Sequence, residues 1–214
     1  MSLYESTMQW FFSDAPIMQR LIEHICLSFA VVAIAAIIAL PLGITVGHLQ
    51  RGEFIIGTLG NLGRALPTLG LITLIGLLVG IGLTAPFVSL VVLAIPPLLA
   101  GSYSAIASVD KNVVFASQVQ GMTVWQVISK VEIPLGWPVI FGALRSAVIQ
   151  VVATATLAAY VADIGLGRFI FTGLKTNDYG QMIGGSLIVI ALALGMELLF
   201  ECVALLRSGL GTRR

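Results

Sequence analysis

The sequence predicts an all-α protein that crosses a membrane about five times. Of its 214 residues, 58% are hydrophobic and only 10% are charged, whereas a soluble domain carries about 25% charged residues. Several uncharged runs are long enough to cross a bilayer, which takes roughly 20 residues in a helix. A polar stretch, residues 110–138, lies between these runs. We interpret residues 1–214 as one transmembrane domain, and the net charge of +1 gives no argument for a nucleic-acid partner.

The amino-terminal half contains three of the predicted spans. Residues 1–20 carry aromatic side chains that suit a membrane interface. In the first span, Gly43 and Gly47 form a G-x-x-x-G pattern that permits close helix packing. Glycine recurs at every third position, at Gly57, Gly60 and Gly63, near the start of the second span. The three spans cover residues 21–47, 55–81 and 87–107.

Prolines interrupt two of these spans. Pro67 is predicted to break the second span near its middle, and Pro96 and Pro97 are predicted to break the third. Broken helices are tolerated at membrane depth where they line a cavity or pack against protein. These prolines are therefore candidates for bends that shape a gate or pathway, and simple packing kinks are the other interpretation. The sequence leaves both open.

Residues 110–138 are predicted to form two short helices outside the membrane. Asp110 can cap the first helix, and Gly121 suits the left-handed residue that ends it. Thr123 and Gln126 form a T-x-x-Q capping box that starts the second helix. Pro134 then marks the approach to the next apolar segment.

The carboxy-terminal half supplies the last two spans, residues 139–161 and 179–206. Residues 163–178, between them, are interpreted as an amphipathic loop. Cys26 and Cys202 lie far apart in the chain and are interpreted as buried apolar side chains rather than a disulfide or metal pair.

The polar stretch resembles a loop of the permease subunits of bacterial ABC importers. Ala116, Gly121 and the string EIPL at 132–135 are similar to the E-A-A…G…I-x-L-P pattern of that family. The family's leading Glu falls at Phe115, and its second Ala at Ser117. The strings GMTVWQVISKVEIPLGWPVI, TATLAA and GLGRFIFTGL are similar to permeases for osmoprotectants such as glycine betaine, choline and carnitine. The resemblance covers about residues 21–207.

This resemblance implies a function in ATP-driven import by alternating access. Residues 110–138 would be the coupling loop between the third and fourth spans and would dock on an ATP-binding subunit, which is expected in two copies and would bind ATP and Mg. The other implied partners are a second permease subunit, identical or homologous, and an extracytoplasmic solute-binding protein. The residues expected to couple to the ATPase are Ala116, Gly121, Met122, Thr123, Trp125, Glu132 and Pro134.

The chain itself is not expected to be an enzyme. It has no Ser-His-Asp set, no metal-ligand cluster and no phosphate-binding glycine loop. We therefore expect no catalytic residues, no bound metal and no cofactor of its own. His24 and His48 stand singly near span ends, where an interfacial or structural role is expected.

Charge counting gives an orientation in the bacterial inner membrane. With the coupling loop in the cytoplasm, most basic loop residues also lie there, as the positive-inside rule requires. An odd number of spans then places the amino terminus outside and the carboxy terminus in the cytoplasm. The cytoplasmic set is Arg51, Lys111, Lys130, Arg207, Arg213 and Arg214, against Arg20, Arg168 and Lys175 outside.

Four charged residues lie inside the predicted spans, namely Arg64, Arg145, Glu197 and Glu201. The first three are expected at similar depth, and Glu201 lies one turn nearer the cytoplasmic end. An unpaired charge inside a bilayer is unfavourable by about 2.5–3.5 kcal/mol on insertion scales. We therefore predict that Glu197 or Glu201 bonds Arg145, with Arg64 as the second candidate, and the alternative is that these side chains reach separately towards the headgroups.

Two other functional classes remain open from the sequence. A secondary transporter or channel would work without an ATPase, and these four charges would be the candidates for its substrate site. A membrane scaffold without transport activity would leave the prolines and the loop motif unexplained. Copurification with an ATP-binding subunit would favour the importer over both the secondary transporter or channel and the scaffold.

Overall fold

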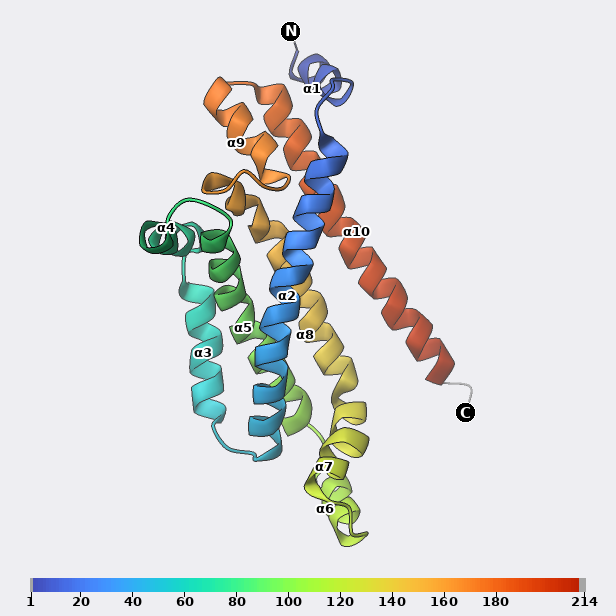
Figure 1. Cartoon of the computed structure of the whole chain (residues 1–214). Coiled ribbons are helices and arrows are strands. Elements are labelled where there is room, and N and C mark those ends of the chain that lie inside the picture. Colours follow the sequence, from blue (N-terminus) through green and yellow to red (C-terminus); the bar gives the residue numbers. More distant parts are fainter. Residues whose placement is uncertain (1, 212–214) are drawn as a thin grey trace. The chain divides into compact units, whose positions relative to one another are not determined.

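The computed structural model describes residues 2–211, apart from the side chains of residues 61, 62, 64 and 207–211, and all its regular elements in this range are helices (Figure 1). In chain order they are α1 (Leu3–Phe11), α2 (Ile17–His48), α3 (Glu53–Ala65), α4 (Thr68–Val79), α5 (Thr84–Ala107), α6 (Lys111–Val119), α7 (Val124–Val127), the π-helix η1 (Ile128–Glu132), α8 (Ile133–Thr154), the 3₁₀ helix η2 (Ala155–Tyr160), α9 (Gly167–Thr176) and α10 (Tyr179–Gly211).

Long apolar helices dominate this fold. Four described stretches are long and apolar enough to cross a membrane, and they are Ile17–His48, Thr84–Ala107, Val124–Tyr160 and Tyr179–Leu206. Helix α4 is apolar but shorter. These helices confirm the prediction of an all-α polytopic membrane protein.

The chain forms two compact units, each assembled from separate parts of the sequence. Unit 1 comprises Met1–Val31, Thr68–Leu90 and Val148–Arg214. Unit 2 comprises Val32–Pro67 and Val91–Ala147. Helices α2, α5 and α8 each continue from one unit into the other.

In unit 2, glycines let α2 and α8 approach the backbone of α5. A Cβ atom added at Gly43 would lie 2.7 Å from the carbonyl oxygen of Leu99, and one at Gly47 would lie 2.9 Å from that of Tyr103. The predicted G-x-x-x-G contact is therefore confirmed. On α8, a Cβ at Gly136 would lie 2.7 Å from the carbonyl oxygen of Ala105. Glycine is needed at these places because any side chain would push two helices apart.

In unit 1, an aromatic cluster joins the amino-terminal helix to α9 and α10. Trp10 contacts Phe169 with ring centroids 5.0 Å apart in an edge-to-face arrangement, and Leu166 is buried beside them. Gly184 of α10 leaves room for the indole ring, since an added Cβ would overlap it. Trp10 is thus a core residue, and the expected interfacial role of the amino-terminal aromatics is wrong for it.

His24 is a second fixed point of unit 1. Its ring is fully buried, with Nε2 2.8 Å from the carbonyl oxygen of Val152 and Nδ1 3.3 Å from the backbone nitrogen of Leu166. Because the Leu166 N–H can only donate, Nδ1 is the acceptor and the proton lies on Nε2. Both ring nitrogens are satisfied, so His24 has the structural role expected of it.

Pro96 and Pro97 do not break the third predicted span. Helix α5 runs from Thr84 to Ala107 with both prolines inside it. Gly63 of α3 lies against the ring of Pro96, where an added Cβ would come within 2.6 Å of Cγ. Neighbouring helices can support a helix that lacks two of its N–H groups, and this contact favours packing over a break.

Pro67 separates two helices, as predicted. The residue before it, Leu66, is extended with ψ 124° and ends α3, and α4 begins at Thr68. The region predicted as span 55–81 therefore consists of two helices of 13 and 12 residues. At about 1.5 Å per residue, neither is long enough to cross a bilayer.

Three other expectations differ from the structure. The helix expected to begin at residue 139 is continuous from Val124, and the loop expected at residues 163–178 contains helix α9. Phe169 of α9 is buried, which explains why this segment is ordered as a helix. Cys26 and Cys202 are both exposed, not buried.

Gly43→Ala tests the close contact between α2 and α5. The added methyl group meets the α5 backbone, so we expect a loss of about 1–3 kcal/mol, typical of overpacking, seen as a lower apparent melting temperature in detergent. Gly195→Ala is the matched control, because a Cβ there meets nothing within 4 Å. Equal melting temperatures for the two variants would contradict the contact.

Candidate functional site

The predicted coupling loop forms a helical hairpin, defined here as residues 110–132. Asp110 caps α6, its side chain accepting a hydrogen bond from the Asn112 backbone at 2.8 Å. Gly121 has a left-handed backbone with φ 84° and ends this helix. Thr123 and Gln126 form the predicted capping box of α7. All three local predictions are confirmed, and α6 and α7 lie side by side at one end of unit 2 (Figure 1).

The hairpin exposes a group of large apolar side chains. Trp125 is 73% exposed and Phe115 is 65% exposed. The others are Val113, Val119 and Val124. Exposed apolar patches on a protein surface mark places of contact with a partner or a membrane.

Helix α7 continues into the membrane-spanning helix α8 through the π-turn η1. Here the Ile133 N–H donates to the carbonyl of Ile128, five residues earlier. Pro134 has no N–H, and its ring would clash with the carbonyl of Lys130 in a regular α-helix. The wider turn accommodates the proline, so α7, the π-turn and α8 form one continuous helix, and α6 is joined to it through the turn at Gly121.

Glu132, at the end of this turn, points inward. Only 3% of the residue is exposed, and its carboxylate oxygens lie 2.8 and 2.9 Å from Nδ1 of His48, the last residue of α2. The other residues predicted to couple to an ATPase lie closer to the surface. Ala116, Gly121, Thr123, Trp125 and Pro134 are exposed, and Met122 is half-buried.

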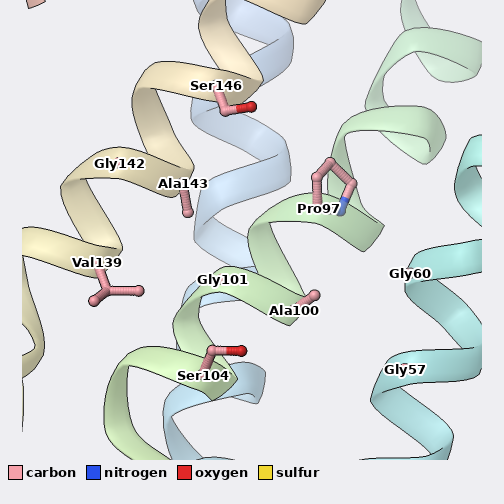
Figure 2. Close-up of a pocket in the computed structure, with 10 residues that line it drawn as sticks. All are labelled: Gly57, Gly60, Pro97, Ala100, Gly101, Ser104, Val139, Gly142, Ala143 and Ser146. Carbon is pink, nitrogen blue, oxygen red and sulfur yellow. The ribbon is translucent and has the colours of Figure 1, made fainter. Parts of the chain in front are cut away.

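A cavity of about 570 Å³ opens between α3, α5 and α8 within unit 2. Figure 2 shows α5 between the glycines of α3 on one side and α8 on the other, with the hydroxyls of Ser104 and Ser146 drawn as sticks. Pocket volumes of about 300–1,000 Å³ are typical of small-molecule sites. The lining residues are Gly57, Gly60, Pro97, Ala100, Gly101, Ser104, Val139, Gly142, Ala143 and Ser146.

The predicted gate and charge residues are distributed differently. Pro97 lines this cavity, whereas Pro96 packs on Gly63. The charge pairing stays a prediction: the Arg64 side chain is outside the described part of the structure, and Arg145 belongs to unit 2 while Glu197 and Glu201 belong to unit 1.

The sequence did not predict the contact of His48 with Glu132, nor the serines that line the cavity. A signal for the cavity was present in the recurrence of Gly57, Gly60 and Gly63, because glycines spaced by three give a helix one face without side chains. No comparable signal joined His48 to Glu132, which are far apart in the sequence.

Residues 39–206 match the family model for the binding-protein-dependent transport system inner membrane component. The chain is 33% identical, over 80% of its length and 79% of the relative, to the glycine betaine/carnitine/choline transport system permease protein OpuCB of Bacillus subtilis (strain 168). It is 34% identical to the carnitine transport permease protein OpuCB of Listeria monocytogenes, covering 82% of this chain and 80% of that one. The osmoprotectant import permease protein OsmY of Salmonella typhimurium is 30% identical, over 83% and 76% of the two chains.

The fold is similar to that of solved ABC transporters. A chain of the inward-facing MetNI methionine ABC transporter superposes with a TM-score of 0.73 at 22% sequence identity, covering 89% of this chain and 97% of that one. An amino acid ABC transporter, solved with histidines, gives a TM-score of 0.67 at 19% identity, covering 96% of this chain and 97% of that one. At these identities the likeness concerns the fold.

Thiol labelling tests whether the cavity is open to water. Ser104 is exposed and lines it, whereas Ser102, two residues earlier on the same helix, is fully buried against α2. In a background with Cys26 and Cys202 replaced by serine, we expect a small water-soluble thiol reagent to label Ser104→Cys but not Ser102→Cys. If neither variant were labelled, the cavity would be closed to water. If both were labelled equally, α5 would be turned differently.

Proposed function

Because the chain belongs to the family of binding-protein-dependent transport system inner membrane components, we propose that it is the membrane-spanning permease of an ATP-driven importer for a small quaternary amine. Its relatives are permeases for glycine betaine, carnitine, choline and osmoprotectants. The observation that carries the importer assignment is the hairpin, which exposes apolar side chains and continues directly into a membrane-spanning helix.

The hairpin docks on an ATP-binding subunit. Trp125 and Phe115 supply large apolar side chains for this contact, and aromatic residues of this kind dominate the binding energy of protein interfaces. The partner would bind ATP and Mg, and this chain would hydrolyse nothing itself. Two such subunits, a second permease chain and an external solute-binding protein complete the assembly.

Transport then proceeds by alternating access. When the two ATP-binding subunits close on ATP, they move the hairpins, and each hairpin moves its α8 because α7 continues into α8 without a break. The cavity beside α8 would change its shape with this movement. Its lining of glycine, alanine and serine, with Pro97 and Val139, carries no charge and is weakly polar, which suits the passage of a small zwitterion such as glycine betaine.

Copurification tests the assignment most simply. The chain, expressed with the proteins encoded beside its gene and extracted in mild detergent, should retain an ATP-binding subunit. Replacing the exposed Trp125 by Ala should weaken this retention, since truncating an interface aromatic often removes about 2 kcal/mol or more. Replacing the exposed Leu187, on α10, by Ala is the control. A chain that purifies alone and transports without ATP would be a secondary transporter or channel.

Gly121→Val tests the geometry of the hairpin. A β-branched residue is strained at φ 84°, while a Cβ at this place meets no other atom within 4 Å. The effect should therefore come from the backbone alone. We expect normal membrane insertion but loss of the ATP hydrolysis that the solute-loaded binding protein stimulates.

Gly121→Asn is the matched control, because asparagine tolerates the left-handed conformation. It should keep most of the stimulated hydrolysis. Full stimulation in Gly121→Val would show that this turn does not have to hold its shape.

The hairpin lies in the cytoplasm in this proposal, with the amino terminus outside. Gln118 is exposed on α6, and Thr172 lies on α9. In intact cells, an impermeant thiol reagent should label Thr172→Cys, and it should label Gln118→Cys only after permeabilisation, in a background without Cys26 and Cys202. Labelling of Gln118→Cys in intact cells would invert the orientation.

A further inference from the structure

The contact between His48 and Glu132 is buried at the base of the hairpin. The side chains are 14% and 4% exposed, and Nδ1 of His48 lies 2.8 and 2.9 Å from the two carboxylate oxygens. A carboxylate accepts hydrogen bonds and cannot donate them, so the Nδ1–H of His48 is the donor and the Glu132 carboxylate is the acceptor. A buried carboxylate needs such a partner, because burial without one is strongly unfavourable.

The pair joins two elements that are far apart in the chain. Glu132 ends the π-turn through which the hairpin enters α8, and His48 ends α2. The π-turn sets the side of the helix from which Glu132 projects, because each residue of an α-helix turns by about 100° and this turn holds one residue more. Glu132 thereby points towards α2.

His48 lies at a tight corner that leads into α3. Gln50 and Gly52 both have left-handed backbones, with φ 52° and 84°, and the Gln50 side chain donates to the carbonyl of Gly47 at 3.0 Å. Helix α3 begins at once, at Glu53. About one and two turns further on, its Gly57 and Gly60 form one wall of the cavity.

We propose that the His48–Glu132 pair is the joint through which the hairpin moves α3. This inference rests on the proposed function. The α8 wall of the cavity moves because α8 continues the hairpin, and the α3 wall moves because Glu132 pulls His48 and the corner with it. Apolar side chains of similar size stabilise a fold as well as a buried polar pair does. A polar pair differs in that it resists separation, since separation would leave the Glu132 carboxylate buried without a partner.

Thiol labelling of the two walls tests the joint in the complete importer. Gly57→Cys reports on α3, where an added Cβ meets nothing within 4 Å, and Ser146→Cys reports on α8. Both are made without Cys26 and Cys202 and labelled with a small methanethiosulfonate, before and after trapping with ATP and vanadate. With the pair intact, we expect trapping to change both labelling rates by roughly fivefold or more, the usual range of coupling between sites.

Two double variants separate the joint from simple structural support. His48→Phe with Glu132→Leu removes the hydrogen-bonded pair but keeps an apolar contact, so the protein should fold and bind its ATPase. In it, we expect the response at Ser146→Cys to remain and that at Gly57→Cys to disappear. The exchange His48→Glu with Glu132→His restores the pair and should restore part of the response at Gly57→Cys. Glu53→Gln removes an exposed carboxylate at the same corner and should leave both responses unchanged.

The outcomes are distinct. A response at Gly57→Cys that survives in the apolar variant would overturn the joint, as would the exchange variant failing to recover any response while it assembles normally. Equal loss at both positions in the apolar variant would also overturn it, because that is the result of general damage. If Ser146→Cys does not respond to ATP even with the pair intact, the proposed function is the part that fails.

Discussion

Close backbone contact around helix α5 is the constraint on which unit 2 depends. Among lipid tails, no hydrophobic force draws one apolar helix to another, so helices associate through van der Waals contact at short range. Glycines at 43, 47 and 136 provide this contact along α2 and α8. The cavity lies between α3, α5 and α8 and is lined mostly by glycine, alanine and serine.

In the proposed importer, the hairpin moves this packed unit, which requires a rigid connection between them. The π-turn provides one connection, since it lets the chain pass Pro134 without ending the helix. The buried contact of Glu132 with His48 provides a second one, to the corner between α2 and α3. The surface of the hairpin and its base therefore have different roles: the exposed aromatic side chains suit a partner, and the buried carboxylate suits the connection to the rest of the unit.

Local sequence signals predicted the hairpin well. The cap at Asp110, the left-handed Gly121 and the capping box at Thr123 follow from interactions within a few residues, which a single sequence reveals. Family membership was predictable because the resemblance depends on short strings, one in this region and two between residues 154 and 174.

Features that depend on distant contacts were not predictable. Pro96 stays within a helix because Gly63 of another helix packs against it. The burial of Trp10 depends on Gly184 and Phe169, which come much later in the chain. Likewise, nothing near His48 indicates that its partner is Glu132. The pattern of apolar residues in the sequence predicts the helices, but only the folded structure shows which small residue packs against which large one.

Uptake of radiolabelled glycine betaine, choline or carnitine into proteoliposomes tests the central claim most directly. The vesicles would contain this chain with its copurifying ATP-binding subunit. The solute-binding protein would be added on the side of the bilayer opposite that subunit. We expect accumulation of at least one of these amines that requires both ATP and the binding protein and stops with vanadate. Accumulation driven by an ion gradient in the absence of ATP would contradict the account.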